Sequence, residues 1–129
     1  MIQPYSADDF RRLALERFPE LREEFEDYAG LLHLQMAAFA RHTQQAKGDA
    51  DWDTYEKCIA LADELWQRPS HDLLNALNVS FLENLDFDGP RGPVAWEYLS
   101  PGLKLGWRSM QRYLEDLTRL PTKKRGKHL

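Results

Sequence analysis

The sequence predicts an all-α protein of about six antiparallel helices, arranged as a bundle or as a short α-solenoid of stacked helical hairpins. Apolar residues recur at spacings of three and four along most of the chain, which is typical of amphipathic helices. The chain holds only two valines and two isoleucines, and no segment alternates with a period of two, so strands are not expected. The connections between the expected helices are short, which favours antiparallel neighbours.

The length and composition fit one domain with one hydrophobic core. Of 129 residues, 43% are hydrophobic and 12% are aromatic. A chain of this length buries about two-thirds of its unfolded surface, and disordered chains are poor in aromatic residues. We expect a single helical domain over residues 1–120 and a basic, disordered tail over residues 121–129.

Capping residues, proline and glycine mark the first helices. Ser6, followed by Asp9, is typical of an N-cap with acidic residues in the first turn. Pro19 cannot continue that helix and suits the start of another. Gly30 indicates a kink or a break, and the apolar residues after it predict a central buried helix. Gly48 is expected at the left-handed end of that helix.

Two further helices follow. Asp51 is expected to cap a helix that runs to about Gln67, and Ser70 is expected to cap the next. The apolar face of the second one is predicted to comprise Leu74, Leu77, Phe81 and Leu85.

The last third of the chain predicts a loop over residues 86–93 and a short helix over residues 94–99. Ser100 and Pro101 begin the last helix, and Pro121 is expected to end it.

The formal net charge of −4 conceals an uneven distribution. The tail after Leu120 holds four basic and no acidic residues, so residues 1–120 hold 13 basic against 21 acidic residues, a net charge of −8. Residues 49–88 hold ten acidic and two basic residues, which is also −8. An acidic body makes a nucleic-acid partner unlikely on charge grounds. Four basic residues without an apolar anchor do not hold a protein on a membrane.

The acidic segment after the central helix has only part of a calcium loop. Asp49, Asp51 and Asp53 have the spacing of the first three ligands. Thr54 and Ala60 stand where the turn glycine and the bidentate glutamate are needed. Acidic residues that stabilise a helix N-terminus explain the pattern better, so we expect no metal and no cofactor.

No set of residues predicts a catalytic centre. The single cysteine, Cys58, excludes an internal disulfide framework and a cysteine-based zinc site, and its apolar neighbours indicate a buried side chain. His33 lies in the apolar helix and is expected as a hydrogen-bonded core residue. We expect neither a catalytic nor a metal site, and the absence of a secretory signal indicates a cytoplasmic protein.

Asn75 and Asn78 are unusual in an otherwise apolar helix. They lie three residues apart, hence on one helix face, and asparagine disfavours helix interiors. Together with Ser80 they indicate either a buried polar contact that docks this helix on its neighbour, or a recognition face.

The acidic segments give the candidate partner-binding residues. The carboxylates expected to steer a partner are Asp49, Asp51, Asp53, Glu56, Asp86 and Asp88. Trp52, as an exposed aromatic residue among acids, and Phe87 are expected to anchor it. Turn formation is the alternative role of Asp86 and Asp88.

Two longer motifs carry a family resemblance. GLLHLQMAAFAR (residues 30–41) and NALNVSFLENLDF (residues 75–87) resemble a family of small, uncharacterised, all-helical bacterial proteins over most of residues 18–115. Such proteins are similar in size and charge to immunity proteins of bacterial toxin systems.

The resemblance and the charge pattern imply a non-enzymatic protein-binding module of the immunity or antitoxin kind, with a basic protein as its partner. The alternative is a helical small-ligand or regulatory module, with a pocket lined by His33, Asn75 and Asn78.

Overall fold

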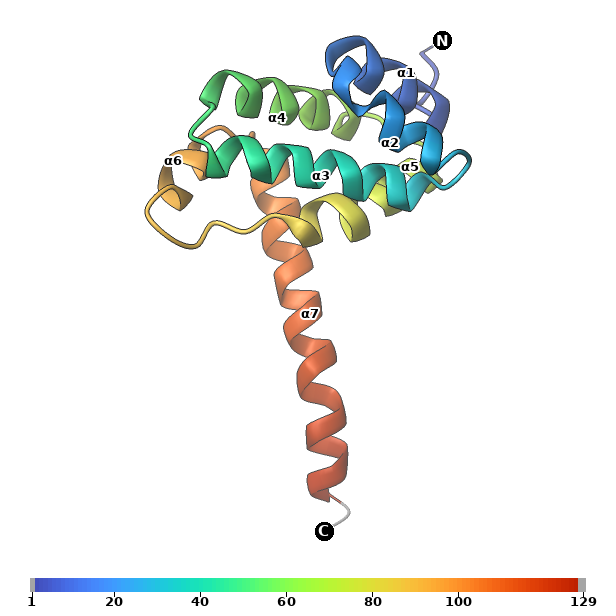
Figure 1. Cartoon of the computed structure of the whole chain (residues 1–129). Helices are drawn as coiled ribbons and strands as arrows, with labels where there is room; N and C mark the ends of the chain where they lie inside the picture. The colour runs from blue at the N-terminus through green and yellow to red at the C-terminus, as the bar shows by residue number, and fades with distance from the viewer. Residues whose placement is uncertain (1, 128–129) are drawn as a thin grey trace.

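The computed structural model describes the backbone of residues 2–127 and the side chains of residues 2–118 (Figure 1). Its elements, in chain order, are α1 (Ala7–Arg17), η1 (Pro19–Leu21), α2 (Arg22–Asp27), α3 (Leu32–Gly48), α4 (Trp52–Trp66), α5 (His71–Ala76), η2 (Leu77–Phe81), η3 (Leu82–Asn84), α6 (Gly92–Glu97) and α7 (Pro101–Lys127). No strand occurs among the described residues apart from one isolated bridge between Tyr5 and Pro69. The predicted all-α class is therefore confirmed.

The helix α3 is the centre of the fold. It packs against α4 on one side and against α5 and η2 on another (Figure 1). Phe39, at its middle, is fully buried, and its ring centroid lies 5.8 Å from that of Phe10, 5.9 Å from that of Phe18 and 5.2 Å from that of Phe81. A helix that is apolar nearly all round needs such neighbours on several faces, as the sequence predicts.

Local capping signals place three helix starts as expected. The Ser6 hydroxyl accepts a hydrogen bond from the Asp9 amide, and the Asp9 carboxylate accepts one from the Ser6 amide, which forms a capping box on α1. Asp51 caps α4 by accepting from the Thr54 amide, and Ser70 caps α5 by accepting from the Leu73 amide.

The end of α3 differs from the prediction. Gly48 is the last helical residue, and the left-handed residue is Ala50, with φ of 55°. The Asp51 amide donates to the Ala46 carbonyl at 2.8 Å, which is the long-range bond of a Schellman motif. The helix therefore ends at Gly48, but this bond places the left-handed position two residues later, at Ala50.

The segment expected as one helix over residues 71–85 changes its helix type twice. After α5, η2 is a π-helix and η3 is a 3₁₀-helix. Leu73, not Leu74, lies on the buried face; Leu74 is exposed. Leu77, Phe81 and Leu85 are buried as predicted, so the predicted face is wrong only at Leu74, which precedes the π-helix.

The helix α7 leaves the body and projects away from it (Figure 1). Its backbone continues through Pro121 to Lys127, so the end expected at Pro121 is wrong. Lys123, Lys124 and Arg125, which are good helix formers, follow Pro121 after Thr122. The side chains from Arg119 onward, and residues 128–129 entirely, lie outside the described part, so the separate role of a basic tail stays a prediction.

Candidate functional site

Two acidic segments that are distant in sequence lie at one end of the molecule. Figure 1 shows the turn between α3 and α4, the loop before α6, and α6 itself at the same end. The first segment carries Asp49, Asp51, Asp53 and Glu56, and the second carries Asp86 and Asp88; all six are exposed. We call this region, residues 47–56 and 85–98, the acidic end.

Lys47 joins the two segments. Its side chain is only 10% exposed, and its ammonium group lies 3.1 Å from a carboxylate oxygen of Asp86 and 2.5 Å from the Asp86 carbonyl oxygen. Gln44 donates to the other carboxylate oxygen at 2.8 Å. Partial burial opposes ionisation of Asp86, but the hydrogen bond and the charge of Lys47 outweigh it and lower the pKa of the carboxyl. This link fixes the loop on the C-terminal end of α3.

Four of the remaining carboxylates play little or no part in holding the fold. Gln45 donates to the Asp49 carboxylate across one helical turn at 3.0 Å. Asp53, Glu56 and Asp88 make no side-chain hydrogen bond or ion pair within the described residues. Asp51 differs, because its hydrogen bonds with Thr54 lower its pKa and start α4. Asp53, Glu56 and Asp88 are therefore available to a partner.

Aromatic side chains lie between the two acidic segments. Trp52 is half-buried and stacks on Tyr98, with ring centroids 5.7 Å apart and an angle of 8° between the rings. Phe87 is also half-buried and lies edge-on to Trp96 and Trp107, at 4.9 and 5.2 Å. Trp52 is therefore less exposed than expected, because Tyr98, the residue after α6, stacks on it, and the local sequence does not reveal this partner. Both residues are still partly exposed.

The acidic stretch 49–88 does not form one continuous surface. Glu64 lies near the opposite end of α4, where its carboxylate accepts from Arg17 at 2.8 Å and from the Tyr5 hydroxyl at 3.1 Å. These bonds, Arg17 first, lower the pKa of Glu64. Glu64 is thus part of a structural contact, and only the segments around Asp51 and Asp86 lie together.

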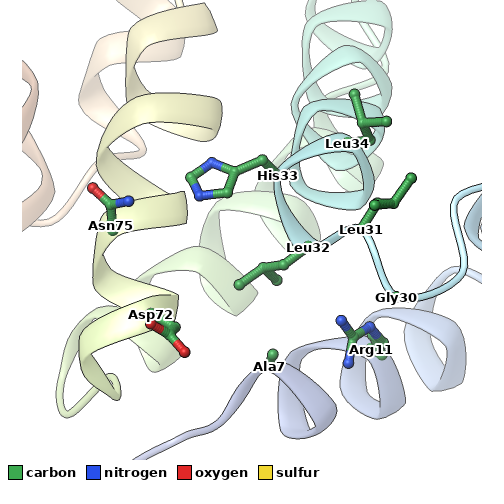
Figure 2. A pocket seen from close by; sticks show the side chains of 9 residues that line it. All are labelled: Ala7, Arg11, Gly30, Leu31, Leu32, His33, Leu34, Asp72 and Asn75. Atoms are coloured by element: carbon green, nitrogen blue, oxygen red, sulfur yellow. The ribbon is translucent and has the colours of Figure 1, made fainter.

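A second candidate region is a groove between α1, the start of α3, and α5. Its volume is about 540 Å³. Figure 2 shows His33 of α3 across from Asn75 of α5, with Arg11 of α1 at the other side. The lining residues are Ala7, Arg11, Gly30, Leu31, Leu32, His33, Leu34, Asp72 and Asn75. His33 and Asn75 were expected at a pocket, whereas Arg11 and Asp72 were not.

The polar contact that docks the 71–85 segment on α3 is made by Ser80. The His33 Nδ1 atom lies 2.8 Å from the hydroxyl of Ser80, which is buried. His33 itself is exposed, so it is hydrogen-bonded as expected but is not a core residue. Asn75 is exposed and Asn78 is half-buried and does not line the groove. The asparagines are therefore not the buried contact that the sequence suggested as one alternative.

Cys58 is fully buried as expected, and burial raises the pKa of its thiol to about 11. A thiol with this pKa stays protonated near neutral pH and is a poor nucleophile. Within the described part of the chain, no three His, Cys, Asp or Glu side chains gather as a metal site requires. None of the described helices combines the length and the apolar character needed to cross a membrane.

A family model for a domain of unknown function, DUF7674, matches residues 11–115. The chain belongs to the DUF7674 family. The match runs from within α1 to within α7, and it contains both acidic segments and every residue that lines the groove except Ala7. This membership agrees with the sequence resemblance to an uncharacterised family. No curated protein and no solved structure matches the chain.

Proposed function

We propose that this DUF7674 protein is a non-enzymatic binding protein whose acidic end docks a basic surface of another protein, as immunity and antitoxin proteins do. The observation that carries the proposal is the placement of two acidic segments, 30 or more residues apart, at one end of the molecule, each with a half-buried aromatic residue, Trp52 or Phe87. Exposed carboxylates steer a basic partner and exclude acidic ones. Rigid aromatic side chains supply contact area at a small entropic cost.

Lys47 supports this function without contacting the partner. It neutralises one carboxylate, Asp86, and thereby holds the loop in place. Asp53, Glu56 and Asp88 keep their charges free at the surface. A preordered loop reduces the entropic cost of association, so the acidic end binds as a formed surface.

The test uses a binding partner isolated with the full chain and identified, and a triple variant with Asp53→Asn, Glu56→Gln and Asp88→Asn. We expect the partner to be basic, and we expect Kd to rise at least tenfold in the variant because three steering charges are lost. The matched control is Glu23→Gln, Glu26→Gln and Asp27→Asn, which removes three exposed carboxylates of α2. Its Kd should equal that of the wild type in calorimetry at low salt.

Two results would reject this proposal. One is an acidic or uncharged partner surface. The other is an equal loss of affinity in the two triple variants, which would mean that net charge matters and the acidic end does not.

The groove favours a second candidate function, the binding of a small ligand. A cavity of about 540 Å³ has the volume of ordinary ligand sites, and it combines leucine side chains with an imidazole, a guanidinium, a carboxylate and an amide. A small amphipathic molecule suits this lining. A fragment screen by amide chemical-shift mapping should move signals of residues 30–34 and 72–75, and Asn75→Leu should abolish the shifts. A screen that moves no groove signal rejects this candidate.

A further inference from the structure

The aromatic residues of the acidic end fall into two groups that differ in their cations. In the first group, Phe87 and Trp96 lie edge-on to each other, with ring centroids 4.9 Å apart. The ammonium group of Lys47 lies 5.8 Å from the centroid of Phe87. Lys104 and Arg108 lie over the ring of Trp96, at 5.8 and 5.0 Å from its centroid. Both rings are therefore already paired with cations of the chain itself.

Trp52 and Tyr98 form the second group. Their rings are nearly parallel, with an angle of 8° and centroids 5.7 Å apart. The buried ring of Tyr55 meets both of them edge-on, at 5.5 Å from each centroid. The Tyr55 hydroxyl in turn donates to the Ala95 carbonyl at 3.3 Å. The Trp52–Tyr98 pair thus lies on a fixed base, and both of its residues are half-buried and keep exposed surface.

The surroundings of the Trp52–Tyr98 pair are acidic. Asp53 and Glu97 are its neighbours in sequence, and Glu56 lies one helical turn further along α4. All three are exposed and make no side-chain hydrogen bond or ion pair within the described residues. No cation of the described part of the chain lies over either ring, and this includes the exposed Lys57. A cation from another molecule suits this place, because the rings and the carboxylates attract it together.

We propose that the Trp52–Tyr98 pair binds an arginine side chain of the protein partner, with the guanidinium stacked on the rings and paired with Glu56. A guanidinium is planar, so it stacks on a ring and donates to a carboxylate at the same time, which an ammonium group does less well. The chain's own contacts agree: its two arginines lie 4.4 and 5.0 Å from the ring centroids, and its two lysines both lie at 5.8 Å. This inference rests on the proposed function of the acidic end and names the side chain that docks there.

The test follows the indole N–H signals of the tryptophans in two-dimensional NMR spectra of the full chain. The probe is a tripeptide of glycine, arginine and glycine, blocked at both ends so that the guanidinium is its only charge. We expect the Trp52 signal to move furthest and to saturate. The same peptide with lysine should bind several-fold more weakly. The peptide with citrulline, which lacks the charge, should leave the signal in place.

Two variants locate the site. Glu56→Gln removes a carboxylate that makes no contact within the described residues, so the fold should stay intact while the Kd of the arginine peptide rises several-fold. Trp52→Leu should abolish binding. The matched controls are Glu23→Gln of α2 and Tyr113→Leu of α7. They remove an exposed carboxylate and an exposed ring elsewhere, and they should leave the Kd unchanged.

An unmoved Trp52 signal overturns the inference, as does an equal response to the arginine and citrulline peptides or an unchanged Kd in Glu56→Gln. If the triple variant of the acidic end loses affinity for the partner but arginine leaves the Trp52 signal unmoved, the proposed function stands and only this inference fails. A partner without a basic surface rejects the proposed function and this inference with it.

Discussion

Carboxylates near the two ends of α4 differ in whether they have hydrogen-bonding partners. At its N-terminal end, Asp53 and Glu56 are exposed, and the nearby Asp88 is too. Near its C-terminal end, the carboxylate of Glu64 is held by Arg17 and Tyr5. Both groups belong to one acidic stretch of the sequence, so the count of charges does not distinguish them. The hydrogen-bonding partners do: a carboxylate that is already paired contributes to the fold, and a free one is available for recognition.

The largest predicted effect concerns Lys47, which holds the acidic end together. Lys47→Ala removes a buried ammonium group and leaves the Asp86 carbonyl without its donor, so the free energy of unfolding should fall by about 2–3 kcal/mol. Lys57→Ala, an exposed lysine of α4, should change it by less than about 0.5 kcal/mol. Urea unfolding measures both. Equal effects would show that Lys47 is not the link between the segments.

The second prediction is a pH dependence that only the paired carboxylates should show. The pKa of Asp86 is lower in the folded chain than its ordinary value, so ionised Asp86 stabilises the fold above its unfolded pKa of about 4. This stabilisation is lost as the pH falls through the folded pKa. Asp86→Asn should cost about 1 kcal/mol near pH 6, because solvent screens the pair, and less at pH 3.

Glu56→Gln is the control for that pH dependence, since Glu56 lies beyond the first turn of α4 and makes no ion pair within the described residues. Its stability should follow the wild type at both pH values in urea titrations. If Asp86→Asn is as destabilising at pH 3 as at pH 6, the carboxylate charge does not hold the loop.

A smaller effect is expected at the turn that starts the acidic end. Ala50 has a left-handed conformation that costs a residue with a Cβ atom about 1 kcal/mol, and glycine adopts it freely. Ala50→Gly should therefore raise the free energy of unfolding by about 0.5–1 kcal/mol, after the greater entropy of glycine in the unfolded chain is subtracted. A thermal melt that shows destabilisation would contradict the Schellman geometry.

The smallest effect is expected at the other end of α4. Glu64→Gln weakens a partly exposed pair with Arg17, so the loss should be below about 1 kcal/mol. Tyr5→Phe, which removes only the second bond to Glu64, should cost less still. If either variant lowers the free energy of unfolding by more than Lys47→Ala in the same urea assay, the contacts of Glu64 stabilise the fold more than those of Lys47, contrary to this account.

Local rules predict much of the helical framework, because the information sits within a few residues. Ser6, Asp51 and Ser70 cap helices through hydrogen bonds to residues three positions later in the sequence. Gly30, with φ of 77°, lies in the turn between α2 and α3. The two acidic segments lie in one region because Lys47 contacts Asp86. No local pattern contains that contact.

The same limit explains the remaining errors. Trp52 is half-buried because Tyr98 stacks on it from 46 residues away. The groove needs Arg11 from α1 and Asp72 from α5, which no motif joins. The π-helix at Leu77–Phe81 lies in a segment whose apolar pattern predicts one regular α-helix. In each case the outcome depends on tertiary packing, which overrides the local preference.

The most direct test of the central claim is amide hydrogen exchange of the full chain with and without its isolated protein partner. The account predicts that binding slows exchange at residues 47–56 and 85–98, where the free carboxylates and half-buried aromatic rings lie together. Slowed exchange confined to residues 30–34 and 71–80, or to α7, with the acidic end unchanged, would contradict it.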